Sequence, residues 1–420
     1  MTAEIKGGPL FGDIAAVPSK SDMHRILICS AFADGKTRIS ARGELPDDVA
    51  ATMRCLSALG ACIERDDGGV TVTPAKSVPE TAELFVGESG STFRFLVPVA
   101  ASLGVEADFI TEGRLGSRPM VPLIEALEAH GAKFERQGNG VLRVSGKLSG
   151  NEYAIRSDVS SQFISGILFA LAVTGGGSVR LIGKTESAGY IEMTLDALSR
   201  FGIKTEFKNG EISVSGKLKS PGAVASEGDW SGAAFWLCAG AACGGITVTG
   251  LSGQSRQGDR AIVEILRGMG ASVEIKGGAV AVSGGDLHGV ELDASDIPDL
   301  TPPVAALAAI SEGKTVIRGA SRLRIKESDR LAALASSLGA IGADVKETDD
   351  GLVICGKEKL PGGSADSWGD HRIAMAVAVA SVRSGEITLS GAESVSKSYP
   401  GFWKDFQELG GNVKTTEGSK

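Results

Sequence analysis

The chain has 420 residues, 58 of them glycine, and a formal net charge of −8 at pH 7. Its length exceeds the size at which one hydrophobic core stops growing, so two domains are expected. The acidic balance argues against a protein that binds nucleic acid or a membrane surface, because phosphate groups are bound by basic patches.

The sequence shows no signal for export, membrane insertion or metal binding. The first residues, MTAEIKGGPLFGDI, lack the basic and apolar regions of a secretion signal. There is no apolar run of the about 18 residues that would span a bilayer. Six cysteines show no CxxC pair and no metal-ligand spacing, so we expect them to be small core residues in a reducing compartment. A cytoplasmic protein is predicted.

A module of helix, glycine and short strands recurs along the chain. A glycine follows each helix-like stretch at intervals of roughly seventy residues, which fits a small βαβ-type subdomain and is too long for a solenoid repeat. Glycine suits the position after a helix, because a left-handed backbone costs it little. The six glycines are Gly60, Gly131, Gly202, Gly270, Gly342 and Gly410.

In chain order, the modules follow a first strand at residues 2–13. The fourth module shows the pattern most clearly, with a β-branched strand at 246–249, a helix over Asp259 to Met269, and two strands at 271–275 and 279–282. Helices of small residues are expected inside the fold, against the sheets; they are 161–173, 231–242, 302–310 and 371–382. The modules occupy 35–73, 105–145, 177–215, 243–284, 313–355 and 385–414.

Six modules divide evenly into two domains of the α/β class. The best boundary is a glycine-containing break at 224–229, and the first strand is free to pair with the later half. We therefore predict domain 1 as residues 1–13 plus 229–420 and domain 2 as residues 14–228. The crossings near residues 14 and 228 would act as hinges, with the active site in the cleft between the domains, where closure excludes water.

Three clusters in the first half place polar residues where the repeat needs none. In PSKSDMHR, Lys20 and Arg25 lie on the first turns of a helix, a ready anion site, although an ordinary capped helix explains the pattern equally well. GESGSTFR is a glycine-rich loop that lets backbone N–H groups approach an anion, or a simple turn before a buried helix. Arg118 precedes Pro119 and is held extended, whereas Ser160 and Ser161 fit plain helix capping as well as anion binding.

Two clusters in the second half are more specific. RLRIKESDR holds six ionisable residues in nine, and helical spacing would put Lys326 and Arg330 on one face; a solvated charge run is the alternative. Asp299, in a loop fixed by proline, fits a lone carboxylate base. His371 and Arg372 open an alanine-rich helix. Many cations and few bases indicate a substrate with phosphate and carboxylate groups, and proton transfer by a carboxylate and a lysine.

These clusters, in this order, closely resemble the 5-enolpyruvylshikimate-3-phosphate (EPSP) synthase family. The resemblance covers nearly the whole chain and implies a two-domain inside-out α/β barrel, each domain having three βαβαββ units with pseudo-threefold symmetry. The implied enzyme transfers enolpyruvate from phosphoenolpyruvate to the 5-hydroxyl of shikimate 3-phosphate in aromatic amino acid biosynthesis, without metal or cofactor. The matching motifs are PSKSDMHR, GESGSTFR, RLGSRPM, SSQF, the Ser187–Tyr190 turn, EGDWS, IPD, RIKESDR, GDHR and SKSYP.

The resemblance also implies residue roles. The catalytic residues would be Asp299, Glu327, Lys326, Lys20 and His371. Shikimate 3-phosphate would be bound by Lys20, Ser21, Arg25, Ser160, Ser161, Gln162, Ser187, Tyr190, Asp299 and Lys326. Phosphoenolpyruvate would be bound by Lys20, Gly90, Arg118, Gln162, Arg330, Arg372 and Lys397.

Two departures and several alternatives accompany the resemblance. Glu88 and Arg322 stand where many relatives carry asparagine, and they would retune the affinity of a polyanion site. Gly90 is typical of members that glyphosate inhibits, so glyphosate is expected to compete with phosphoenolpyruvate. The sister enzyme acting on UDP-N-acetylglucosamine usually has a cysteine in the loop at 111–122, which this chain lacks. A non-catalytic anion-binding repeat protein and an RNA-end-processing relative are disfavoured by the acidic balance. We expect a monomer.

Overall fold

The computed structural model describes residues 1–41, 43–183 and 188–417, so Ser187 lies outside the described residues. The described chain forms six mixed sheets of four strands each. It divides into two compact units, of which unit 1 comprises Met1–Val17, Glu44–Pro46 and Glu227–Lys420, and unit 2 comprises Pro18–Gly43 and Asp47–Ser226. The predicted hinges near residues 14 and 228 stay predictions.

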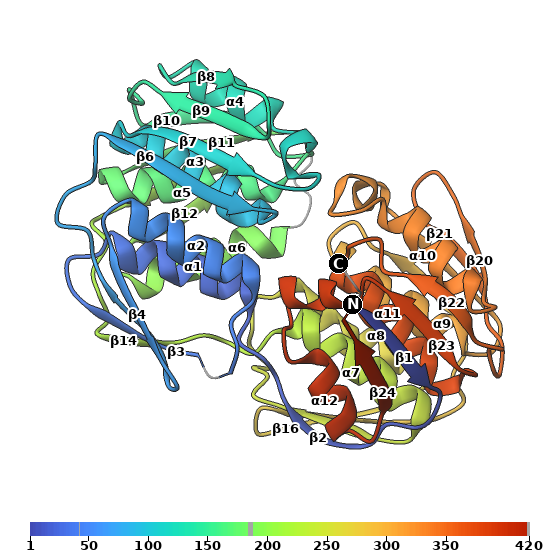
Figure 1. Cartoon of the computed structure of the whole chain (residues 1–420). Helices are drawn as coiled ribbons and strands as arrows, with labels where there is room; N and C mark the ends of the chain where they lie inside the picture. Colours follow the sequence, from blue (N-terminus) through green and yellow to red (C-terminus); the bar gives the residue numbers. More distant parts are fainter. Residues whose placement is uncertain (42, 184–187, 418–420) are drawn as a thin grey trace. The chain divides into compact units, whose positions relative to one another are not determined.

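Unit 2 contains three modules, and each consists of a strand, a helix, a second strand, a second helix and two further strands (Figure 1). The first has β14 (Ala223–Ala225), α1 (Lys20–Ala31), β3 (Thr37–Ser40), α2 (Asp47–Ala58), β4 (Cys62–Asp66) and β5 (Gly69–Thr73). The second has β6 (Thr81–Gly87), α3 (Gly90–Leu103), β7 (Glu106–Thr111), α4 (Val121–Glu128), β8 (Lys133–Arg136) and β9 (Val141–Ser145). The third has β10 (Glu152–Arg156), α5 (Ser161–Thr174), β11 (Gly176–Ile182), α6 (Ala188–Arg200), β12 (Lys204–Lys208) and β13 (Glu211–Ser215).

Unit 1 repeats the same order three times. The first module has β2 (Gly12–Ala15), α7 (Trp230–Cys243), β15 (Ile246–Thr249), α8 (Ile262–Gly268), β16 (Ser272–Lys276) and β17 (Ala279–Ser283). The second has β18 (Glu291–Asp293), α9 (Thr301–Ala309), β19 (Lys314–Arg318), α10 (Arg330–Ala340), β20 (Asp344–Glu347) and β21 (Leu352–Cys355). The third has β22 (Gly363–Asp366), α11 (His371–Ala380), β23 (Ile387–Ser390), α12 (Phe402–Glu408), β24 (Asn412–Thr416) and β1 (Thr2–Lys6).

Every sheet has the same topology. In β6-β7-β9-β8, β6 and β7 run parallel, whereas β9 runs antiparallel to both β7 and β8. The parallel pair needs a helical crossover, which α3 supplies, and the antiparallel pair is a hairpin. This repetition confirms the predicted α/β class and the βαβαββ unit.

Three sheets are completed by strands from distant parts of the chain. The first strand, β1, pairs antiparallel with β23 and β24, and Figure 1 shows it in blue among the red strands of the later half. The next, β2, pairs with β15 instead of with β3, which follows it in the chain. The place beside β3 is taken by β14, which overlaps the start of the segment 224–229 that we interpreted as a glycine-containing break.

The core of each unit is built around helices of small residues. In unit 1, α9 and α11 are buried along their whole lengths, and in α7 every residue from Gly232 to Ala242 is buried. In unit 2, α3 and α5 show the same near-complete burial. A helix that is apolar all round belongs inside a fold, so the predicted placement of these helices is confirmed. Cys62 and Cys355 are exposed, which corrects the expectation that the cysteines lie in the core.

The six recurring glycines all have a left-handed backbone, with φ between +77° and +104°. The predicted helix over Asp259 to Met269 is nearly right, but its first turn is the 3₁₀ helix η2 (Gly258–Ala261), which precedes α8. A left-handed backbone costs a residue with a side chain about 1–2 kcal/mol. The glycines therefore fix the tight exit from each helix into its following strand.

Two of these glycines in unit 2 offer a matched comparison. A Cβ at Gly60 would lie 2.6 Å from the backbone oxygen of Ser77, whereas one at Gly202 would meet only the side chain of Lys219, at 3.5 Å or more. We expect Gly202→Ala to cost about 1–2 kcal/mol from backbone strain. Gly60→Ala should cost more, because backbone must also move. Thermal unfolding of the two variants beside the parent chain tests this; equal losses of Tm would contradict the steric explanation.

Candidate active site

In unit 1, predicted site residues and capping carboxylates lie at the N-termini of helices. Asp370 caps α11, and its carboxylate accepts a hydrogen bond from the backbone N–H of Arg372 at 3.0 Å. Asp329 caps α10, which begins at Arg330. Asp299 lies in η3 (Pro298–Leu300), which leads directly into α9. Helix N-termini favour bound anions, so this end of the unit is suited to a negatively charged ligand.

Arg330 is the centre of the cluster in unit 1. Its side chain is 2% exposed and lies 2.7 Å from Asp370, 3.0 Å from Asp299 and 2.7 Å from Glu327. Burial by itself lowers the pKa of the guanidinium, but the three carboxylates outweigh it and hold the group charged. For Asp370, burial acts in the opposite direction and raises the pKa of the carboxyl, yet the charge of Arg330 brings that pKa below its usual value. The cluster is therefore a buried network of ion pairs.

Asp299 receives three cations. Arg330 lies 3.0 Å from its Oδ1 and Lys326 lies 3.8 Å from the same oxygen, while Arg372 lies 3.2 Å from Oδ2. The Asp299 side chain keeps 12% of its surface exposed. The carboxylate is held in one orientation by charge-assisted contacts on both oxygens. This geometry suits a group that takes a proton from a hydroxyl placed against it.

Lys326 and Arg330 do not share a helix face, so that prediction was wrong. The 3₁₀ helix η4 (Ser321–Ile325) ends at Lys326, which is extended, and α10 begins only at Arg330. The carboxylate of Asp329 accepts a hydrogen bond from the N–H of Ala332 and starts α10 there. Lys326 and Arg330 therefore do not lie on one continuous helix, yet both side chains contact Asp299.

The remaining predicted residues of unit 1 lie around α11. Lys397, in the 3₁₀ helix η6 (Ala392–Lys397), donates a hydrogen bond to the backbone oxygen of Gly369 at 2.8 Å. His371 is buried, with Nδ1 3.9 Å from Asp370. Lys397 and His371 thus contact the loop and the cap that precede Arg372.

In unit 2, the predicted Lys20 pairs with a carboxylate that the sequence did not reveal. Lys20 Nζ lies 2.9 Å from Asp48 Oδ2, and both side chains are mostly buried, at 15% and 12% exposure. Lys20 is the first residue of α1, and Asp48 is in the first turn of α2. The pair holds the ammonium group at the N-terminal end of two helices.

A second group in unit 2 brings the glycine loop together with Arg118 and Gln162. A Cβ placed on Gly90 would lie 3.0 Å from Arg94 Nη1 and 3.1 Å from Arg118 Nη1. Gln162 accepts a hydrogen bond from Arg94 at 2.7 Å and donates one to Ser91 at 2.9 Å. Arg118 is extended, as the following proline predicted. Two guanidinium groups therefore approach the backbone of Gly90.

Arg25 is buried and its donors are used inside unit 2. It donates to the backbone oxygens of Ser21 at 2.6 Å and Tyr190 at 2.8 Å, and to the hydroxyl of Thr194 at 2.9 Å. Burial lowers the pKa of its guanidinium to about 10. Arg25 thereby joins α1 to α6, and its predicted contact with substrate stays a prediction.

Ser160 caps α5 by accepting a hydrogen bond from the backbone N–H of Gln162 at 3.3 Å, and Ser161 is the first residue of that helix.

A chain of buried hydroxyls connects the helices of the Lys20 and Gly90 groups. His24 Nδ1 lies 2.7 Å from the hydroxyl of Thr52, which lies 2.6 Å from that of Thr92. Thr92 in turn lies 2.7 Å from Ser89, the cap of α3. Burial is the largest reason that the pKa of His24 lies well below its ordinary value, so the ring stays neutral. The network fixes the starts of α1, α2 and α3 relative to one another.

Sequence reasoning gave no role to five residues whose side chains make contacts within the two units. The signal for Arg94 was present, because it ends the GESGSTFR motif, but nothing in the motif assigned it a partner. The others look like ordinary surface or capping residues in the sequence. The residues are Asp48, Arg94, Thr194, Asp259 and Arg200, which pairs with Asp22.

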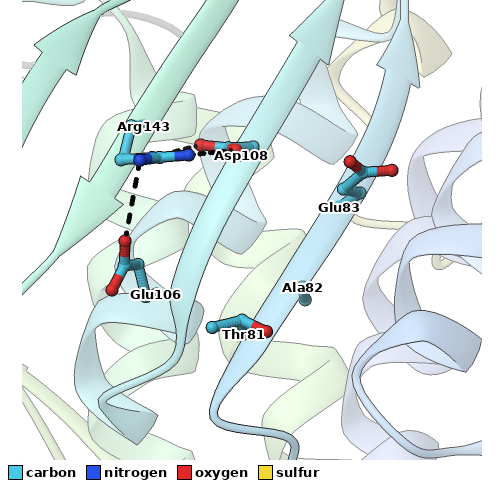
Figure 2. A pocket seen from close by; sticks show the side chains of 6 residues that line it. All are labelled: Thr81, Ala82, Glu83, Glu106, Asp108 and Arg143. Atoms are coloured by element: carbon cyan, nitrogen blue, oxygen red, sulfur yellow. Dashed lines mark hydrogen bonds and ion pairs between the residues drawn. The ribbon is translucent and has the colours of Figure 1, made fainter.

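A separate surface pocket does not carry this chemistry. A pocket of about 240 Å³ lies on the sheet of β6, β7 and β9. Figure 2 shows Arg143 pointing toward Asp108 and Glu106 in its lining. Arg143 lies 2.7 Å from Asp108 and 3.8 Å from Glu106. With Glu83 added, the lining has three carboxylates against one cation, which does not favour an anion. Within the described residues, no cluster of His, Cys, Asp and Glu could hold a metal, and no helix could span a membrane.

Comparisons with known proteins identify the family. A family model of EPSP synthase (3-phosphoshikimate 1-carboxyvinyltransferase) matches residues 5–406. The chain belongs to the EPSP synthase family. Proteins named 3-phosphoshikimate 1-carboxyvinyltransferase from Clostridium kluyveri and Clostridium acetobutylicum are 42% and 41% identical to it, each over 96% of both chains.

Solved structures of EPSP synthases have the same fold. The structure of EPSP synthase from Acinetobacter baumannii matches with a TM-score of 0.81 and 28% identity, covering 99% of this chain and all of that one. The enolpyruvyl transferase NikO from Streptomyces tendae matches with a TM-score of 0.78 at 20% identity, which shows the fold alone. The resemblance and the two-domain α/β fold class are confirmed for this member of the EPSP synthase family.

The two departures of this EPSP synthase family member have contacts inside their own units. A Cβ on Gly113 would lie 2.8 Å from the carboxyl of Glu88, so Glu88 rests against the loop that leads to Arg118. Arg322 donates a hydrogen bond to the backbone oxygen of Ser295 at 2.6 Å, in the loop before Asp299. Each replacement adds a charge beside a loop that carries a predicted site residue.

Proposed function

We propose that this chain is a transferase that moves the enolpyruvyl group of phosphoenolpyruvate to the 5-hydroxyl of shikimate 3-phosphate and releases phosphate. The observation that supports it is the carboxylate of Asp299, held by three cations in a chain of the EPSP synthase family. Both substrates carry phosphate and carboxylate groups, which the cationic clusters suit. The step belongs to the biosynthesis of aromatic amino acids.

Shikimate 3-phosphate meets residues of both units in this proposal. Its phosphate and carboxylate meet the N-termini of α1 and α5 in unit 2, where backbone N–H groups point outward. Its 5-hydroxyl lies against Asp299, with Lys326 on the ring. The binding residues in the described chain are Lys20, Ser21, Arg25, Ser160, Ser161, Gln162, Tyr190, Asp299 and Lys326.

Phosphoenolpyruvate is bound by a second set of residues, which shares Lys20 and Gln162 with the first. The two guanidinium groups at Gly90 fit its charged groups from unit 2, and the start of α11 fits them from unit 1. The binding residues are Lys20, Gly90, Arg118, Gln162, Arg330, Arg372 and Lys397.

The reaction proceeds by addition and elimination. Asp299 takes the proton of the 5-hydroxyl as its oxygen bonds to C2 of phosphoenolpyruvate, and C3 gains a proton. Glu327 and His371 are the two candidates for that proton. The tetrahedral intermediate then loses a proton from C3 as the C2–O bond to phosphate breaks, which forms the enolpyruvyl ether. Lys326, Lys20 and the arginines stabilise the developing charge.

Three further expectations belong to the same proposal. The chain acts as a monomer in the cytoplasm, and glyphosate binds in place of phosphoenolpyruvate. The related transfer to UDP-N-acetylglucosamine is disfavoured, because the loop at 111–122 contains no cysteine.

Phosphate release tests the proposed reaction directly. The purified chain should release phosphate from phosphoenolpyruvate when shikimate 3-phosphate is present. It should release none when UDP-N-acetylglucosamine replaces that acceptor or when the acceptor is left out. Activity with the UDP-sugar alone would overturn the assignment in favour of the sister enzyme, and no release with either acceptor would remove both.

Replacing the proposed base should affect turnover more than binding. Asp299→Asn keeps the shape of the side chain but removes its ability to take a proton. We expect kcat to fall by about 10²–10⁴-fold, the usual contribution of a general base. The exposed Asp286→Asn serves as a control with an equal change of charge. Steady-state kinetics measures both; near-normal kcat in Asp299→Asn would reject the base.

Glyphosate should compete with phosphoenolpyruvate at Gly90. In Gly90→Ala, the new methyl would press on Arg94 and Arg118, whose guanidinium groups must shift by a few tenths of an ångström. We expect higher KM for phosphoenolpyruvate and weaker glyphosate inhibition. Gly339→Ala is the control, because a Cβ there meets nothing within 4 Å. Inhibition that phosphoenolpyruvate cannot relieve would contradict a shared site.

A further inference from the structure

One arginine of the RLRIKESDR motif is not among the substrate-binding residues proposed above. Arg324 lies in η4, two residues before Lys326, and its side chain is 29% exposed. Its Nε and Nη2 donate hydrogen bonds to the backbone oxygens of Asp349 at 3.2 Å and Thr348 at 2.7 Å, in the turn between β20 and β21. Its Nη1 donates to the carboxylate of Asp329 at 3.1 Å. The guanidinium group therefore uses all three of its nitrogens, on groups from two different segments.

The carboxylate of Asp329 connects this contact to the start of α10. It caps the helix by accepting a hydrogen bond from a backbone N–H of the first turn at 3.2 Å. The bridge between Arg324 and Asp329 thus closes residues 325–328 into a short loop, which we call the Lys326 loop. The same guanidinium group joins this loop to the turn between β20 and β21.

The two cations of this region depend on Arg324 to different degrees. Arg330 lies in α10, is 2% exposed, and has three carboxylates within 3.0 Å. Lys326 is 27% exposed, and its extended backbone belongs to the loop that Arg324 closes. Loss of the Arg324 contacts would therefore free the backbone that carries Lys326, whereas the carboxylates would still hold Arg330.

We propose that Arg324 is a positioning residue, which fixes the Lys326 loop and thereby places the ammonium group of Lys326 beside Asp299 for the reaction. This inference rests on the role of Lys326 in the proposed function. An arginine suits the task, because its planar fork has donors on three nitrogens, whereas a lysine offers a single point of attachment. A partly exposed ion pair contributes little by itself, so the two bonds to backbone oxygens are essential to the geometry.

Steady-state kinetics of Arg324→Gln tests the proposal. We expect kcat to fall by about 10–100-fold, because a misplacement of about 1 Å can cost about 10²-fold. The KM for shikimate 3-phosphate should rise, since Lys326 is proposed to contact its ring. The KM for phosphoenolpyruvate should stay near the parent value, since Arg330 keeps its carboxylates. An unchanged kcat, or an equal rise of both KM values, would overturn the proposal.

Two further variants separate the geometry of the fork from its charge. Arg324→Lys keeps the charge but loses the fork, so its kcat should stay closer to that of Arg324→Gln than to that of the parent; full activity would contradict the proposal. Arg318→Gln removes the same charge from β19 of the same module, where the arginine is 64% exposed. It should leave kcat and both KM values unchanged. A loss equal to that in Arg324→Gln would show an effect of charge alone and would reject the positioning role.

Proteolysis without substrate tests the loop by itself. A glutamate-specific protease cleaves after Glu327, and local opening of the Lys326 loop makes that bond accessible. The fragment that begins at Ser328 should appear faster from Arg324→Gln than from the parent or Arg318→Gln. If it does so but the parent transfers no enolpyruvate, the proposed function fails while the hold of Arg324 on the loop stands. Equal rates in all three proteins would refute that hold.

Discussion

The buried charge of Arg330 constrains the whole of the cluster in unit 1. A guanidinium at 2% exposure is stable only if carboxylates surround it, and Asp370, Asp299 and Glu327 do so. These partners come from three different parts of the chain, so the loops before α9, α10 and α11 must meet at one point. Helix N-termini and fixed carboxylates are thereby brought together before any substrate binds.

This arrangement explains how a site for polyanions can exist within an acidic chain. The cations around Asp299 are neutralised by carboxylates of the same chain, so the fold avoids the repulsion that unpaired cations would cause. The same pairing holds Lys20 against Asp48 in unit 2. An incoming anion gains from cations that are already oriented, since little reorganisation is then needed.

Sequence predicted the features that arise from local physics. The recurring glycines have a left-handed backbone at the turn that follows each helix. The interior helices can be recognised in the sequence by their small apolar residues. The relation of Lys326 to Arg330 was predicted wrongly, because charge spacing suggested a helix that Asp329 starts only later. Asp48, Arg94 and Asp259 could not be assigned, because their partners lie 28 residues away or more. Such contacts depend on how modules pack, which periodicity does not encode.

The exchange of strands has a consequence for how the chain can be cut. Within unit 1, β2 pairs with β15. Shortly after β2, the backbone oxygen of Val17 accepts a hydrogen bond from the backbone N–H of Asp229 at 2.8 Å. Nearly all of unit 2 thus leaves and re-enters unit 1 at adjacent points, as an inserted domain does. If unit 2 were removed, a very short linker between Val17 and Asp229 would join the two parts of unit 1. If the removed segment also included β2, the sheet β16-β17-β15-β2 would lose its edge strand. The modular repeat is thus interrupted in sequence but nearly continuous in space.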